Sequence, residues 1–247
     1  MESAFFRYNE DFTLFGAQHL VMLSLTAVIG VLLPLAAHRY WDVRQKLQAA
    51  RLLALCLALA VLGWTGIRIA LGDFDYTADL PLDICNVVAL ALPLLMWRPK
   101  YRVHEILYFW ILAGTIQAVI TPHLYDGFPH FTFIKYWVVH SGLVIYAVYI
   151  TVAYRFYPGW KSLWRAFGYL QLYVLSVLIL NLLLGSNYVY LLSKPPTASP
   201  LDYLGPWPWY LLVAEGLALF LFALMLLPFA GKLQRSNQEH ALAGQPE

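Results

Sequence analysis

Long apolar runs separated by short polar connections dominate the pattern of this chain. An α-helix needs about 20 mostly apolar residues to cross a bilayer. The pattern therefore predicts an all-α bundle of seven transmembrane helices, at roughly residues 16–37, 49–71, 80–97, 104–121, 133–154, 164–185 and 207–229. It divides the chain into an N-terminal segment at 1–15, a transmembrane domain at 16–230 and a disordered tail at 231–247.

The composition agrees with a polytopic membrane protein. Of the 247 residues, 61% are hydrophobic and 12% are charged, whereas about 25% of the residues in soluble domains are charged. The two cysteines are too few for a disulfide framework. The sequence has no glycine-rich phosphate loop, no zinc-site spacing and no basic cluster suited to nucleic acid. We therefore expect no cofactor, no metal ion and no nucleic-acid partner, and the sequence predicts no oligomeric state.

Lysine and arginine gather in alternate connections. On one side they are Arg39, Arg44, Lys46, Arg98, Lys100, Arg102, Arg155, Lys161 and Arg165, followed by Lys232 and Arg235 in the tail. The opposite side has only Arg7 and Lys194. Because positive residues favour the cytoplasmic side, the pattern predicts an outside N-terminus and a cytoplasmic C-terminus. The expected location is the plasma membrane.

The third predicted span, Leu80–Trp97, carries the most informative polar residues. The pattern predicts a helix that opens with Pro81 and places Asp83, Cys85 and Asn86 in its first turn and a half. Polar groups at this depth are costly unless they face protein or a cavity. A helix N-terminus also favours a thiolate over a thiol. Cys85 is therefore the candidate nucleophile.

Polar side chains lie toward the outer end of every predicted span. They include His19, Arg68, Asp83, Cys85, Asn86, Gln117, Lys135, His140, Asn181, Asn187 and Glu215. With a rise of 1.5 Å per residue, Cys85 lies about 7 Å and His140 about 10 Å inside their spans. One such residue alone is typical of a cap or an interhelical hydrogen bond. So many ionisable groups in one layer favour an outward-opening polar cavity with an apolar floor.

Cysteine and histidine at matched depth indicate a thiolate–imidazole pair of the kind used in acyl chemistry. Two structural interpretations stay open. Cys85 could be a small buried hydrophobe, as is expected for Cys56, and His140 could be a histidine that donates to a carbonyl.

Other residues complete the predicted cavity. The candidate hydrogen-bond donors to an oxyanion are Asn86, Gln117 and Asn181. The candidate head-group or charge partners are Arg68, Asp83, Lys135 and Glu215. Arg68 is expected to pair with Asp73, Asp75, Asp83 or Glu215 when no phosphate is bound. The secondary candidates are His19, His123, His130 and Asn187. The loop histidines give only a weak metal signal, so no metal site is predicted.

Several motifs together resemble a known family. LPLDIC, TPHLYDGFPHF with a following VVH, LLLGSNYVYLLSKP and GPWPWY are similar to motifs of the YwaF-like integral membrane proteins. The eukaryotic relatives of that family are the transmembrane protein 164 acyltransferases. The resemblance covers about residues 15–229. Asp83 departs from the pattern, in which a histidine or another polar residue is expected.

The resemblance implies coenzyme-A-independent transfer of a fatty acyl chain between phospholipids through an acyl-cysteine. It also implies a distant relation to androgen-induced hydrolases of fatty-acid esters, which pair a threonine nucleophile with a histidine. The matching motifs place the family cysteine at Cys85 and the histidine at His140.

The sequence therefore predicts a lipid acyltransferase or lipid hydrolase whose substrate is a phospholipid or another acyl-lipid from the outer leaflet. The alternative is a receptor or small-solute transporter with an external binding cavity. A transporter is expected to show broken helices or internal repeats, and neither is visible in the sequence. Labelling of Cys85 by an active-site-directed electrophile would favour the enzyme.

Overall fold

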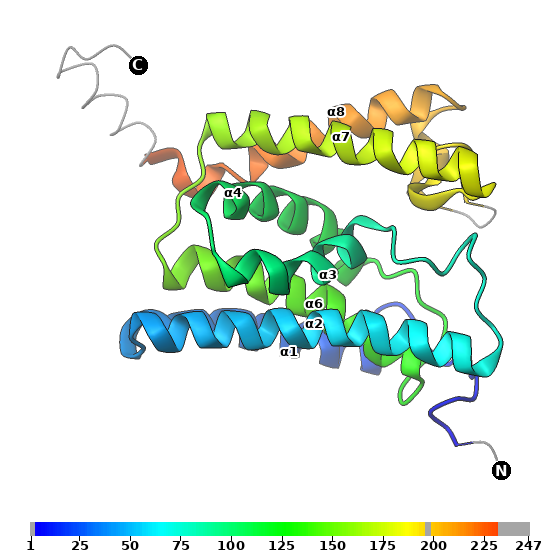
Figure 1. Ribbon diagram of the computed structural model, residues 1–247, viewed down its shortest axis with the longest axis horizontal. Coiled ribbons are helices and arrows are strands. Elements are labelled where there is room, and N and C mark those ends of the chain that lie inside the picture. The colour runs from blue at the N-terminus through cyan, green and yellow to red at the C-terminus, as the bar shows by residue number, and fades with distance from the viewer. Residues whose placement is uncertain (1–2, 196–198, 232–247) are drawn as a thin grey trace.

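The computed structural model describes residues 3–195 and 199–231 as an all-α bundle (Figure 1). In chain order the helices are α1 (Ala17–Tyr40), α2 (Val43–Leu71), α3 (Ile84–Trp97), α4 (Tyr101–Phe109), the π-helical segment η1 (Trp110–Thr115), α5 (Ile116–Ile120), α6 (Phe131–Ala153), α7 (Trp160–Leu184) and α8 (Trp209–Leu224). Short 3-10 helices are η2 (Tyr188–Tyr190), η3 (Pro200–Leu204) and η4 (Leu227–Phe229). Apart from residue 231, the predicted disordered tail lies outside the described residues.

The helices agree with the predicted all-α membrane architecture. Within the described residues, 6 helical segments are long and apolar enough to cross a membrane, and Ile84–Trp97 is a shorter apolar helix. The segment Tyr101–Ile120 counts as one of the spans because α4, η1 and α5 run on without a gap. Helix α2 begins earlier than predicted, because Asp42 and Gln45 form a reciprocal capping box at its first turn.

The prediction for the start of the third span is wrong. Helix α3 begins at Ile84 rather than near Leu80, so Pro81 lies outside the helix. The preceding backbone is held by tyrosines instead: Leu80 N–H donates to the Tyr188 hydroxyl at 2.9 Å, and the Tyr173 hydroxyl donates to Leu82 O at 2.7 Å. With 14 residues, α3 is about 21 Å long, shorter than a hydrocarbon core of about 30 Å.

Helix α6 lies at the centre of the bundle. It packs against α1, α2, α3 and η1, and it is more completely buried than the other long spans of the described chain. In Figure 1, α7 and α8 form a layer on one side of α3 and α4, while α1 and α2 lie on the opposite side. At Gly142 of α6, an added Cβ would lie 2.4 Å from Leu57 Cδ2 of α2. Glycine at this position lets the two helices approach closely.

The connections gather at opposite ends of the bundle (Figure 1). The described N-terminal segment lies at the same end as residues 72–83, 121–130, 185–195 and 199–208, which we call the N-terminal end. The connections 41–42, 98–100 and 154–159 lie at the other end, which we call the basic end. The N-terminal segment is fixed to the connection before α6, because Asn9 N–H donates to Asp126 Oδ1 at 2.9 Å and Phe12 N–H donates to Tyr125 O at 2.9 Å.

Candidate functional site

A polar recess lies where α3 begins, near the N-terminal end. Cys85 is partly exposed, and its Sγ lies 3.3 Å from Thr115 Oγ1. Thr115 is the last residue of η1 and is buried. A π-helical turn inserted in an α-helix is rare and is frequently found at functional sites. The sequence analysis missed Thr115, because nothing in the apolar run of the fourth span indicated the π-helical segment.

The charges of the recess centre on Lys135 of α6. It lies within electrostatic range of Asp83, Cys85 and His140, but among the described residues no hydrogen bond or ion pair joins it to them. Its Nζ lies 4.9 Å from the ring centroid of Trp64 on α2. Asp83 is exposed, and Cys85, Lys135 and His140 are partly exposed, although all of them lie among the packed helices. We use the word recess for the partly exposed space around these four side chains. The structure therefore brings together four of the predicted site residues.

His140 has a defined hydrogen-bond partner. Its Nδ1 donates to Tyr136 O at 2.8 Å, which leaves the lone pair on Nε2 available to accept a proton. The Tyr136 and His140 ring centroids lie 4.1 Å apart, and Tyr136 interacts electrostatically with Cys85. Within the described residues no hydrogen bond joins Cys85 to His140. Counted from the start of each helix, Cys85 is in the first turn of α3 and His140 is in the third turn of α6.

Asn86 adds an unpaired polar atom to the recess. Its side chain is buried, and its Nδ2 donates to Asp83 Oδ2 at 3.5 Å. Its Oδ1 is buried without a hydrogen-bond partner among the described residues. Buried polar atoms are nearly always hydrogen-bonded, so this amide is suited to contact a substrate or a water molecule.

Arg68 pairs with a carboxylate that the sequence analysis missed. Its Nε and Nη2 donate to Asp79 Oδ2 at 3.1 and 2.8 Å, and its Nη1 donates to the Tyr8 hydroxyl at 2.8 Å. Asp73, one of the expected partners, forms a second and longer ion pair, with its Oδ2 4.0 Å from Arg68 Nη1. Asp79 lies in the same connection, 72–83, as Asp73. This shared connection is the only feature of the sequence that points to Asp79 as a partner of Arg68. Lys135 also interacts electrostatically with Asp79, so the Arg68 pair borders the recess.

Two of the predicted asparagines hold the turn after α7. Asn181 is fully buried; its Oδ1 accepts from Ser186 Oγ and Tyr188 N–H, and its Nδ2 donates to Tyr188 O. Asn187 donates to Ser193 O at 2.8 Å in the next turn. Burial raises the pKa of Tyr188 to about 12, so its hydroxyl stays neutral while it donates to Tyr76 O and accepts from Leu80 N–H.

Gln117 and Glu215 lie outside the Lys135 cluster. Gln117 Nε2 donates to Ala113 O at 3.1 Å, within its own helical segment. Glu215 of α8 accepts from Gln171 Nε2 of α7 at 2.6 Å.

The secondary histidines have structural surroundings. His19 is fully buried; its Nδ1 accepts from Phe15 N–H at 2.9 Å, and its Nε2 donates to Val119 O at 3.0 Å. His123 is exposed and lies 2.8 Å from the Tyr125 hydroxyl. Burial lowers the pKa of His130, although Asp126 opposes this effect. Among the described residues, no group of three or more histidines, cysteines or carboxylates is arranged to hold a metal ion.

An apolar cavity of about 310 Å³ adjoins the recess. It lies between the α7–α8 layer and η1, and its lining includes Ile84, Trp110, Gln117, Leu170, Leu217 and Phe222. Ile84 and Trp110 also pack around Cys85 and Thr115. These two side chains therefore separate the cavity from the Cys85 sulfur.

An all-α bundle of apolar, membrane-length helices with a polar recess near one end defines a polytopic membrane protein. The chain belongs to the TMEM164 family, whose model matches residues 14–226. The match confirms the resemblance indicated by the motifs, and the matched region contains the whole recess. No match to the chain was found among curated proteins or among solved structures.

Proposed function

We propose that this protein is a membrane lipid acyltransferase or lipid-ester hydrolase that works through an acyl group on Cys85. The observation that carries the proposal is the single cluster formed by Asp83, Cys85, Lys135 and His140 beside an apolar cavity. The cluster combines a nucleophile, a base and a cation next to space for an acyl chain. The resemblance to the transmembrane protein 164 acyltransferases supports the same chemistry.

In the proposed first step, His140 Nε2 takes the proton of the Cys85 thiol, directly or through one water molecule. Nε2 is the acceptor because Nδ1 donates to Tyr136 O. The thiolate attacks the ester carbonyl of a phospholipid and forms a tetrahedral intermediate. When the ester C–O bond breaks, the lysolipid oxygen takes the proton from His140 and leaves a thioester on Cys85.

The oxyanion of that intermediate requires hydrogen-bond donors. We assign this role to Asn86 Nδ2 and to the Thr115 hydroxyl, because Asn86 lies next to Cys85 in sequence and Thr115 lies 3.3 Å from its sulfur. Donors in such positions contribute roughly 3–4 kcal/mol each to transition-state stabilisation. Asn181 is less suited, because its amide group is engaged in the turn after α7.

In the second half of the reaction, an acceptor hydroxyl attacks the thioester. His140 takes the hydroxyl proton and returns it to the sulfur, so the free thiol is regenerated. A lysolipid acceptor gives acyl transfer, and water gives hydrolysis. Lys135 is placed to attract the phosphate of the substrate, and the Arg68–Asp79 pair borders the same recess.

The mass of the intact protein tests the acyl intermediate. After incubation with phospholipid, the wild-type protein and Cys56→Ala are expected to gain the mass of one acyl chain, whereas Cys85→Ala gains none. Cys56 is a suitable control because it is exposed on α2, which corrects the expectation that it is buried. No adduct with any phospholipid, together with solute flux that is indifferent to Cys85→Ala, would favour the receptor or transporter.

We further propose that the N-terminal end faces the outside of the plasma membrane, because lysine and arginine gather at the basic end. In a background that lacks Cys56 and Cys85, a cysteine at Tyr125 is expected to react with an impermeant maleimide added outside. A cysteine at Tyr40 is expected to react only after the membrane is opened. Both positions are exposed, at 55% and 73%. The reverse labelling pattern would show the opposite orientation.

A further inference from the structure

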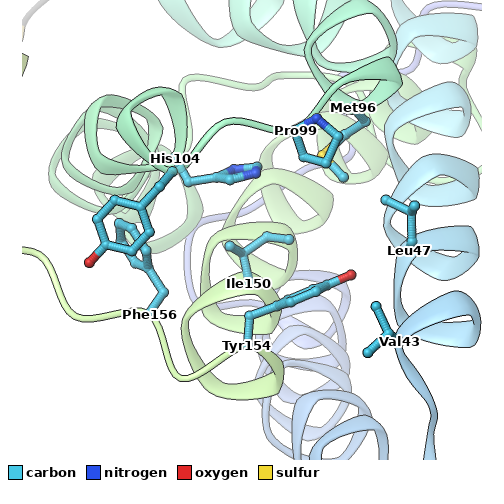
Figure 2. A pocket seen from close by; sticks show the side chains of 9 residues that line it. Val43, Leu47, Met96, Pro99, His104, Ile150, Tyr154 and Phe156 are labelled. Atoms are coloured by element: carbon cyan, nitrogen blue, oxygen red, sulfur yellow. The ribbon is translucent and has the colours of Figure 1, made fainter.

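A second apolar cavity opens at the basic end, far along the bundle from Cys85. Its volume is about 350 Å³, within the range of roughly 300–1,000 Å³ that is usual for small-molecule sites. Its lining includes Val43, Leu47, Met96, His104, Ile150 and Tyr154. Figure 2 shows the Tyr154 side chain pointing toward Val43 and Leu47 on the neighbouring helix, while His104 points in from the other side. The cavity lies where the short helix α3 ends and the chain turns into α4.

The interior of this cavity suits a hydrocarbon chain. Aliphatic and aromatic side chains form most of its wall, and the polar side chain of His104 already has a partner. His104 Nδ1 lies 3.4 Å from the Tyr146 hydroxyl, which donates to Met96 Sδ at 2.9 Å. An acyl chain could enter without leaving these groups unpaired.

Arg51, which bonds to Met96 of the cavity wall, is a cation with unused hydrogen-bond donors. Arg51 of α2 donates from Nε to Met96 O and from Nη2 to Trp97 O, both at 3.1 Å. It is exposed, and it interacts electrostatically with Tyr154 of the cavity wall. A guanidinium has five N–H donors, so most of those of Arg51 are free. Within the described chain, Arg51 forms no ion pair with a carboxylate.

Further positive charge lies on the same segments of the chain. The segments that line the cavity also carry the exposed residues Arg44, Arg98, Lys100, Arg102 and Arg155. Over residues 3–195 and 199–231, none of these is paired with a carboxylate. The buried Glu105 of this end is neutralised by Arg165. Clusters of lysine and arginine next to membrane helices attract anionic lipids, and basic pockets between such helices bind lipid head groups.

We propose that this cavity binds one acyl chain of an anionic phospholipid, whose phosphate is held by Arg51 and attracted by the other cations of the basic end. The apolar wall explains why the ligand carries a hydrocarbon chain, and the positive charge of Arg51 explains why its head group is anionic. This site is separate from the Cys85 recess, which lies toward the opposite end of the bundle. Binding here does not depend on the proposed acyl chemistry.

Native mass spectrometry of the purified full chain in detergent tests this site. The Cys85→Ala variant is used, so that loss of catalysis cannot affect the result, and dioleoyl phosphatidylglycerol is compared with dioleoyl phosphatidylcholine. We expect one saturable site with at least tenfold tighter binding of phosphatidylglycerol. Arg51→Gln is expected to weaken that binding about fivefold. Leu47→Trp, which fills the cavity without changing charge, is expected to abolish it.

Arg39→Gln is the matched control. It removes the same charge at the same end, but Arg39 lies over the Tyr40 ring at 5.8 Å, and its effect is expected to stay within twofold. Arg51 also binds the carbonyls at the end of α3, so Arg51→Lys, which keeps the charge, is included and should retain the preference. Equal binding of the two lipids would overturn the proposal. Phosphatidylglycerol binding that is unchanged by Leu47→Trp would overturn it as well.

Discussion

Replacing Cys85 with alanine is expected to reduce acyl exchange to the rate seen without enzyme, while the bundle stays folded. The reason is chemical, because alanine has no atom that can carry the acyl group. The change removes a single sulfur, whose only described hydrogen-bond partner is Thr115, so the loss of packing is small. The measurement is exchange of a labelled chain between a phospholipid and a lysolipid, with purified protein in nanodiscs.

Companion variants separate the catalytic pair from general damage. His140→Ala is expected to lower the rate of acyl exchange to a similar value. The double variant Cys85→Ala, His140→Ala is expected to lower it no further, because members of one catalytic unit do not act additively. Cys85→Ser is expected to keep a trace of acyl-exchange activity, since a hydroxyl is a weaker nucleophile than a thiol. Cys56→Ala is the control and should match the wild type. Wild-type exchange in Cys85→Ala would refute the nucleophile assignment.

Arg165→Met is expected to destabilise the protein by about 3 kcal/mol. Glu105 of α4 is buried at 7% exposure, and it accepts hydrogen bonds from Arg165 and from the Ser162 hydroxyl of α7. Removing one partner of a buried pair leaves an uncompensated charge, which costs about 3–5 kcal/mol. We expect a destabilisation at the lower end of this range, because the Arg165 side chain keeps 32% exposure. The measurement is loss of helical circular dichroism during titration of detergent micelles with dodecyl sulfate.

The double variant Glu105→Gln, Arg165→Met is expected to recover most of that loss, because no charge is then left buried. Arg102→Met is the matched control. Arg102 is exposed on α4, so its replacement should change stability by no more than about 0.5 kcal/mol. If Arg165→Met is as stable as Arg102→Met, the buried pair does not hold α7 to α4.

The depth of polar residues along the spans does not decide which of them lie together. The sequence predicts one layer that contains Asp83, Cys85, Lys135 and His140, and in the structure Lys135 lies within electrostatic range of the other three. Asn181 and Glu215 lie at suitable positions along their helices, but they bond to neighbours in the turn after α7 and on α7 itself. Distance along a helix gives depth only, whereas the direction of a side chain depends on which helices are its neighbours.

The sequence by itself determined the all-α membrane architecture, the approximate spans and the family. Apolar runs of this length have to form helices, because no water in a bilayer can satisfy their backbone groups. The start of α3, the π-helical Thr115 beside Cys85 and the pairing of Arg68 with Asp79 were decided only by the tertiary structure. Tyr188 fixes Leu80 from far along the chain. Hydrophobic periodicity is local, and a hydrogen bond between remote residues leaves no trace in it.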